Sequence, residues 1–228
     1  MQAESEFKSN NIDIILGIIF SLVLPFLCAL LFQFTGALLP LVLYYGVGCI
    51  IIPLWRKKTL NYNWPNNWAL PLFGILLVVQ IITQWAGLQN IIYVEHSNPA
   101  GVILTLVLWA PINAFMEQIL WIYIFESFGN RFESGKKNGI FLILGILMSL
   151  IFVGLIHALF WNQFLMQFGH QSPFYEIFFI SQFIITPGYI LLYKRTKSMV
   201  PIFFIHIIAD ITAVLGSNYS IIPYLLNF

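Results

Sequence analysis

Long apolar runs dominate this chain and predict its architecture. Seven of them approach or exceed the roughly 20 residues that a helix needs to cross the hydrocarbon layer of a bilayer. They cover residues 12–34, 38–54, 68–88, 100–128, 139–161, 173–193 and 200–215. The runs are continuous and lack the in-out alternation of membrane β-barrel strands. The sequence therefore predicts an all-α, polytopic transmembrane helical bundle with seven spans. A shorter run at 219–228 is a possible short eighth helix or an interfacial segment.

The composition agrees with a membrane protein. Hydrophobic residues make up 60% of the chain and charged residues 8%, and the mean hydropathy is +0.87. A soluble domain carries about 25% charged residues, so that class is excluded. Cys28 and Cys49 lie inside apolar runs, where we expect them to be packing residues rather than a disulfide.

The positive charges predict an orientation. All ten lysine and arginine residues fall in four segments: Lys8; Arg56, Lys57 and Lys58; Arg131, Lys136 and Lys137; and Lys194, Arg195 and Lys197. These segments are the N-terminus and every second loop, which the positive-inside rule assigns to the cytoplasm. We therefore expect a multi-pass protein of the cell membrane with a cytoplasmic N-terminus. The charges form no stripe of the kind that binds nucleic acid, so the lipid bilayer and a membrane-associated molecule are the expected partners.

Four ionisable side chains interrupt the apolar runs: Glu117, His157, His206 and Asp210. A charged side chain at the bilayer centre costs roughly 3 kcal/mol or more. Such a residue therefore persists mainly where function or a buried partner retains it. For each residue taken alone, a structural hydrogen bond is the alternative to a functional role.

The spacing of these residues indicates which of them share a helix face. Asn113, Glu117 and Trp121 recur at every fourth position and form one stripe. His206 and Asp210 are also four residues apart, so they project from one face within reach of each other. A histidine–carboxylate pair of this kind can orient an imidazole, ligate a metal or relay protons.

Neighbouring residues carry further expectations. Gly154, three residues before His157, is expected to let another helix approach closely. Glu126 lies nine residues after Glu117, on the opposite helix face, and is expected to be an interfacial charge. No role is assigned to three ionisable residues near the other ends of the spans: His96, His170 and Glu176.

The order of these residues resembles the CAAX protease and bacteriocin-processing (CPBP, or Abi) family. Its members are intramembrane glutamic endopeptidases of the type II CAAX prenyl protease kind. The family pattern is Glu-Glu-x-x-x-Arg, Phe-x-x-x-His and His-x-x-x-(Asn or Asp), each motif on its own transmembrane helix. The resemblance covers about residues 99–215; the His206–Asp210 motif matches fully, and Glu117 and His157 match as key positions. It implies N-terminal transmembrane helices in residues 1–95 and a CPBP-like catalytic core in residues 96–228.

Three positions depart from the family pattern. Gln118 replaces the second Glu, Ile122 stands where the Arg is expected, and Val153 replaces the Phe, although Phe152 is adjacent. A Glu and an Arg that interact can be lost together without leaving an unpaired charge. The same departures would also accompany a loss of catalysis.

The resemblance implies a division of labour that suits peptide hydrolysis. Glu117 and His157 would activate a water molecule, while His206 would stabilise the oxyanion and Asp210 would fix its tautomer. The substrate would be a membrane-associated protein or peptide. No cofactor is expected, although two histidines and two carboxylates are acceptable zinc ligands.

Two other functions are compatible with the same residues. A non-catalytic CPBP-like membrane scaffold, immunity or regulatory protein would explain Gln118 and Ile122. A proton-coupled transporter would use the ionisable residues as a relay, but no internal repeat of the kind found in many transporters is visible. Counted from the basic loops, Glu117 lies roughly 21 Å, His157 roughly 30 Å and His206 roughly 14 Å along their helices. If these residues meet, their helices must tilt or begin outside the hydrocarbon.

Overall fold

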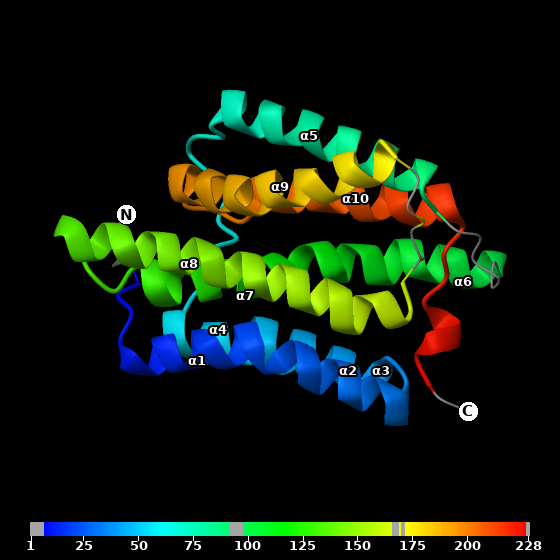
Figure 1. The fold of residues 1–228 in the computed structure, drawn as a ribbon, viewed down its shortest axis with the longest axis horizontal. Helices are drawn as coiled ribbons and strands as arrows, with labels where there is room; N and C mark the ends of the chain where they lie inside the picture. Colours follow the sequence, from blue (N-terminus) through cyan, green and yellow to red (C-terminus); the bar gives the residue numbers. More distant parts are fainter. Residues whose placement is uncertain (1–6, 92–97, 166–168, 170–171, 227–228) are drawn as a thin grey trace.

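The computed structural model describes residues 7–91, 98–165, 169 and 172–226 of the chain. In this part of the chain the regular elements are helices that lie along one common long axis (Figure 1). The all-α prediction is confirmed. His96, His170 and the boundary between residues 95 and 96 lie outside the described residues, and the division into two regions stays a prediction.

Several helical segments follow one another without a loop and form longer rods. The N-terminal half contains α1 (Asn11–Leu22), α2 (Leu24–Thr35), α3 (Leu38–Leu41), the π-helix η1 (Val42–Ile51), α4 (Ile52–Lys57) and α5 (Leu70–Gln89). The C-terminal half contains α6 (Pro99–Leu104), the π-helix η2 (Thr105–Trp109), α7 (Ala110–Gly129), α8 (Gly135–Leu155), the π-helix η3 (Ile156–Phe160), the 3₁₀ helix η4 (Trp161–Gln163), α9 (Phe174–Thr196), α10 (Val200–Ser217) and the 3₁₀ helix η5 (Ile222–Tyr224).

The number of spans agrees with the prediction. Among the described residues, six continuous helices are long and apolar enough to cross a membrane: Leu38–Lys57, Leu70–Gln89, Pro99–Gly129, Gly135–Gln163, Phe174–Thr196 and Val200–Ser217. The α1–α2 pair meets the same criterion as one span that is bent by 45°. Pro25 lies in the first turn of α2, where it has no N–H to continue the hydrogen bonds of α1, and this accounts for the bend. Counting the pair as one broken span gives the predicted seven.

Helix α7 lies at the centre of the bundle, where it packs against α8, α10, α1 and η1. Every residue from Glu117 to Gly129 is buried. Gly145 allows α8 to lie close to α7, since a Cβ atom there would stand 2.6 Å from the carbonyl oxygen of Phe125. The expectation that Gly154 has this role was wrong, because no neighbouring atom lies within 4 Å of the corresponding position there.

The rod that carries His157 is longer than the membrane is thick. Residues Gly135–Gln163 form 29 residues of continuous helix, about 44 Å at ~1.5 Å per residue, against about 30 Å of hydrocarbon. The rod starts at Gly135 rather than at residue 139, and its first turns extend beyond the neighbouring helices (Figure 1). Because these turns extend past the neighbouring helices, a count from the basic loop overstates how deep His157 lies in the bundle.

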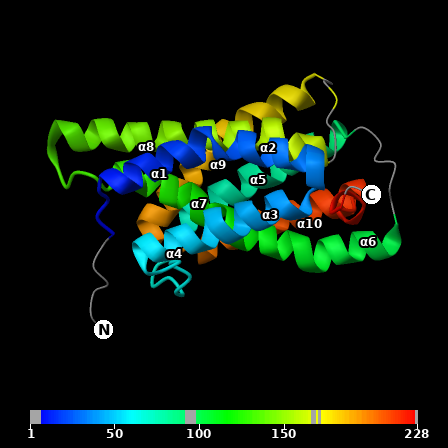
Figure 2. The same ribbon diagram turned by 90° about the horizontal axis from the view of Figure 1, so that it is seen from below.

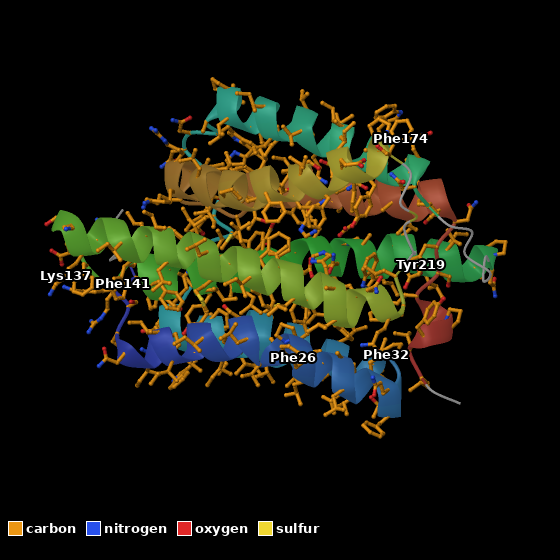
Figure 3. All side chains as sticks on the ribbon, in the orientation of Figure 1. Phe26, Phe32, Lys137, Phe141, Phe174 and Tyr219 are labelled. Atoms are coloured by element: carbon orange, nitrogen blue, oxygen red, sulfur yellow. The ribbon has the colours of Figure 1, made fainter. Side chains whose placement is uncertain are left out.

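The four basic segments gather at one end of the bundle. Lys8 Nζ lies 2.8 Å from Glu133 Oε1, and the backbone N–H of Met199 donates to Asn61 at 2.8 Å, so loops distant in sequence lie side by side there. Figure 3 shows Lys137 at this end and Tyr219 at the other. This grouping is what the alternation of charged loops requires. The side of the membrane that this end faces stays a prediction.

The C-terminal tail packs at the end away from the basic loops (Figure 2). Its described part, residues 219–226, contains only the single turn η5 and no half-length helix. The carbonyl groups of Tyr224 and Leu225 accept hydrogen bonds from the backbone N–H groups of Ala37 and Leu38, at 2.6 and 2.9 Å. The tail therefore caps the start of α3, at the turn that joins the first two spans.

We expect Gly145→Ala to destabilise the protein by about 1–3 kcal/mol, because the added methyl group forces α7 and α8 apart. Gly154→Ala is the matched control on the same helix and should be neutral or slightly stabilising, because alanine favours helix and has room there. Thermal unfolding in detergent micelles measures both effects. Equal stability of the two variants would contradict the close approach of α7 and α8.

The predicted topology can be tested with single cysteines at exposed positions. Cysteines replacing Lys58 and Lys136 should react with a membrane-impermeant maleimide only from the cytoplasmic side, and a cysteine replacing Glu176 only from the other. The native Cys28 and Cys49 are free and fully buried, as expected from the sequence, and should give little background. Labelling of positions 58 and 136 from opposite sides would refute the assigned spans.

Candidate active site

Helices α7 and α10 bring three of the four candidate residues together. Nε2 of His206 lies 3.6 Å from Oε2 of Glu117 and 3.7 Å from Oδ1 of Asp210. All three residues are buried, with Glu117 only 2% exposed. The separations exceed an ordinary hydrogen bond, so these atoms remain available to other groups in the site.

Glu117 is held by a residue from a different span. The hydroxyl group of Tyr44 donates a hydrogen bond of 2.9 Å to Oε1 of Glu117. Tyr44 itself is fully buried and packs edge-on against Trp161 and face-on against Phe152. One carboxylate oxygen of Glu117 is therefore fixed by Tyr44, while the other faces His206.

Asp210 is held in the same way, through an intermediate amide. Nδ2 of Asn113 donates to Oδ2 of Asp210 at 3.0 Å, and Oδ1 of Asn113 accepts from the hydroxyl group of Tyr45 at 2.6 Å. Asn113 belongs to the predicted stripe with Glu117, so this helix face contributes two residues to the site. The second oxygen of Asp210 is the one that faces His206.

The ring of His206 packs against two aromatic side chains that also pack on each other. Its ring centroid lies 5.3 Å from that of Trp121, nearly parallel, and 6.4 Å from that of Tyr189. Nδ1 of His206 is buried and makes no hydrogen bond with the described residues. This nitrogen therefore has an unused hydrogen-bonding capacity inside the site.

His157 stands apart from the other three residues. Its Nδ1 lies 2.8 Å from the carbonyl oxygen of Val153, an acceptor, so Nδ1 carries the proton and Nε2 has a free lone pair. No approach of 4.0 Å or less joins its ring nitrogens to the described carboxylates, although it is close enough to His206 for an electrostatic interaction. The side chain is exposed, unlike those of the other three. His157 is therefore the exposed member of the group.

Non-α segments present several of these residues. η1 carries Tyr44 and Tyr45, η2 leads into the turn of α7 with Asn113, and η3 carries His157. π-helical turns occur frequently at functional sites. η1 and η2 each end two residues before a proline, Pro53 and Pro111, whose missing N–H breaks the regular ladder. The two prolines are thus a signal in the sequence from which these turns could be predicted. Tyr44 and Tyr45 were not among the site residues predicted from the sequence.

The positions that depart from the family pattern have ordinary surroundings. Ile122 is buried in the apolar core. Gln118 is fully buried; its Nε2 donates to the hydroxyl group of Tyr62, and its Oε1 makes no hydrogen bond with the described residues. Phe152, next to Val153, packs on Tyr44. Although the Glu and Arg of the pattern are replaced, no charged side chain beside Ile122 or Gln118 is left without an ion-pair partner among the described residues.

The described residues contain no group of three or more His, Cys, Asp or Glu side chains arranged to hold a metal ion. The expectation that catalysis needs no cofactor stays a prediction.

A second buried polar cluster lies nearer the basic end. Glu126 is 5% exposed, forms an ion pair with Lys57 and accepts a hydrogen bond of 2.9 Å from the hydroxyl group of Tyr193. The expectation that Glu126 is an interfacial charge was wrong, because the ends of α4 and α9 cover it. Asp13 forms a similar group with Arg56 and Tyr123, at 2.8 and 3.0 Å. These residues join the spans and are separate from the candidate site.

Fold and site together define a multi-pass, all-α membrane protein with a buried Glu–His–Asp cluster near its centre. Residues 99–212, half of the chain, match the family described as Type II CAAX prenyl endopeptidase Rce1-like. The chain belongs to this family of endopeptidases, as its motifs indicated. Comparisons with curated proteins and with solved structures found no match.

The Lys57–Glu126 pair gives a test of the buried clusters. Glu126→Leu alone should destabilise the protein by about 3–5 kcal/mol, because it leaves the Lys57 ammonium group without its counter-ion. The double change with Lys57→Met should recover most of that loss, because both charges are then removed. Thermal unfolding of the two variants in micelles measures the difference. A double variant no more stable than Glu126→Leu would show that the pair is not coupled.

Proposed function

We propose that this chain is an intramembrane endopeptidase that hydrolyses a peptide bond of a membrane-associated protein or peptide. The observation that carries the proposal is that a carboxylate oxygen of Glu117 and one of Asp210 both lie within 3.7 Å of Nε2 of His206, from two different helices. Membership in a family of endopeptidases supports it. A carboxylate beside an imidazole in an apolar site suits general acid–base chemistry.

Glu117 acts as the general base. Tyr44 holds Oε1, so Oε2 receives the proton of the attacking water. His157 presents Nε2 with its lone pair free, and this atom accepts the other hydrogen bond of the water. The water oxygen attacks the carbonyl carbon of the scissile bond, and the proton on Glu117 then passes to the departing amine.

His206 stabilises the oxyanion of the tetrahedral intermediate. Its Nδ1 is the ring nitrogen that has no hydrogen-bond partner among the described residues, because Nε2 faces Glu117 and Asp210, so Nδ1 is the atom that would donate to a substrate oxygen. Oδ1 of Asp210 also faces Nε2, and its carboxylate stabilises the imidazolium form of His206, in which both ring nitrogens carry a proton and Nδ1 donates to the oxyanion. The apolar surroundings keep bulk water from weakening this interaction. No cofactor takes part in this scheme.

The substrate reaches the site from the bilayer, because His157 is an exposed residue within a membrane-spanning helix. The family's name points to prenylated proteins that end in a CAAX sequence. We include such peptides among the test substrates and compare them with unmodified ones.

The second candidate is a non-catalytic membrane scaffold or regulatory protein. Gln118 and Ile122, which replace the Glu and Arg of the family pattern, favour it. Both residues are fully packed into the protein, so their presence is compatible with an intact fold whether or not the site turns over.

We expect Glu117→Gln to abolish hydrolysis while the protein stays folded and inserted. The amide has nearly the shape of the carboxylate and can still accept the hydrogen bond from Tyr44, but it cannot take a proton from water. Because Gln118 is also an amide, no adjacent carboxylate can substitute. His157→Ala should also be inactive, and His206→Ala should lower turnover by roughly 10²–10³-fold, as for other single oxyanion donors.

The assay uses the full chain in proteoliposomes with an internally quenched peptide that ends in a CAAX sequence, in farnesylated and unmodified forms. Thermal unfolding checks that each variant is folded. Undiminished cleavage by Glu117→Gln would eliminate the glutamate mechanism. A cellular effect of the unaltered protein that survives in Glu117→Gln, without cleavage of either peptide, would favour the scaffold.

A further inference from the structure

Two consecutive tyrosines on η1 are connected by hydrogen bonds to the two carboxylates of the candidate site, one directly and one through an amide. Tyr44 is fully buried and Tyr45 is 8% exposed, and neither belongs to a family motif. Their rings lie 5.1 Å apart, yet their hydroxyl groups diverge. Tyr44 reaches Glu117 directly, and Tyr45 reaches Asp210 through Asn113.

Burying these hydroxyl groups needs an explanation beyond packing. A hydroxyl group removed from water costs free energy unless it finds a hydrogen-bond partner. The aromatic neighbours of Tyr44 and Tyr45, Phe152 and Trp161, would pack equally well against phenylalanine rings. The polar end of each ring therefore matters for the group that it contacts, and in both cases that contact leads to a carboxylate.

Each contact selects one of two equivalent oxygens. Tyr44 occupies Oε1 of Glu117 and leaves Oε2 facing His206. Asn113, which donates to Oδ2 of Asp210, leaves Oδ1 facing His206. Because the Tyr45 hydroxyl group donates to Oδ1 of Asn113, the amide must present its NH₂ group to Asp210. The pair of tyrosines thus determines which carboxylate oxygens meet the imidazole.

We propose that Tyr44 and Tyr45 are positioning residues, which fix the orientation of the Glu117 and Asp210 carboxylates by direct and Asn113-mediated hydrogen bonds. The effect of this positioning on turnover rests on the proposed function, whereas the orientation of the carboxylates does not. Tyr44 acts on the base, and Tyr45 acts on the residue that holds His206. Loss of the Tyr44 hydroxyl group lets the Glu117 carboxylate rotate away from the attacking water.

The chain offers a matched control for Tyr44. The hydroxyl group of Tyr123 donates to Oδ1 of Asp13 at 3.0 Å, so it also bonds a buried carboxylate, but in the separate cluster with Arg56. Tyr44→Phe and Tyr123→Phe remove the same chemical group from similar surroundings. Both should therefore lower stability by similar amounts, and only the first should affect the site.

The first measurement needs no substrate. Infrared difference spectra of the full protein in micelles identify the carboxyl bands of Glu117 and Asp210 as those missing in Glu117→Gln and Asp210→Asn. A donated hydrogen bond shifts the stretching frequency of a carboxyl group. Tyr44→Phe should therefore shift the Glu117 band and Tyr45→Phe the Asp210 band, while Tyr123→Phe shifts neither. A Glu117 band unchanged by Tyr44→Phe overturns the proposal.

The second measurement follows cleavage of the farnesylated and unmodified quenched peptides. Tyr44→Phe should lower kcat about ten- to a hundred-fold, as expected for a hydrogen bond to a charged group. Tyr45→Phe should lower it about five-fold, as for a bond between neutral groups. KM should change little in either variant, because neither hydroxyl group is proposed to bind substrate. An equal loss of kcat in Tyr123→Phe would reduce the tyrosines to a structural role and overturn the proposal.

The two measurements separate this inference from the proposed function. If the unaltered protein cleaves neither peptide, the protease proposal fails, and the infrared bands still decide whether the tyrosines orient the carboxylates. If cleavage depends on Glu117 but kcat is unaffected by Tyr44→Phe, the protease proposal stands and the positioning role is refuted.

Discussion

Polar and charged side chains inside this bundle must find their partners on other helices, because neither lipid nor an apolar core solvates them. Helix α7 shows the consequence most clearly. Along its length Asn113, Glu117, Tyr123 and Glu126 each contact polar side chains of other helices. These contacts tie α1, η1, α4, α9 and α10 to one central helix. The position of the candidate site is a result of this constraint.

The same requirement separates structural from chemical clusters. Asp13 and Glu126 each face a cation, Arg56 and Lys57, together with a tyrosine hydroxyl group. Their charges are neutralised locally, and replacing such a pair by apolar residues is often tolerated. Glu117 faces a tyrosine and an imidazole instead, with no lysine or arginine in ion-pair range among the described residues. A carboxylate without a permanent counter-charge can exchange a proton. This property distinguishes the candidate site from the two buried ion pairs nearer the basic end.

Much of the fold could be predicted from the sequence, since each span must bury its backbone polar groups in a helix of bilayer length. The separation of four residues between His206 and Asp210 also implied their proximity, because it is a local property of one helix. Contacts between residues of different helices were harder to predict from the sequence. Glu126 was expected to be an interfacial charge because it lies on the helix face opposite Glu117. That position could not reveal its ion pair with Lys57, which is distant in sequence. Gly154 and Gly145 are equally small, and only the packing of α7 shows which of them is in close contact.

The class of membrane protein, the number of spans, the family and the four candidate residues could all be predicted from the sequence alone. Those features depend on hydrophobicity, charge and spacing within single helices. The contacts that lead from Tyr44 and Tyr45 to the two carboxylates, and the exposure of His157, became visible only with the packing of the helices. Such contacts depend on how helices rotate and tilt against one another. Rotation and tilt are fixed by the packing of many side chains at once. They also depend on local backbone geometry, such as the π-helical turns of η1 and η3.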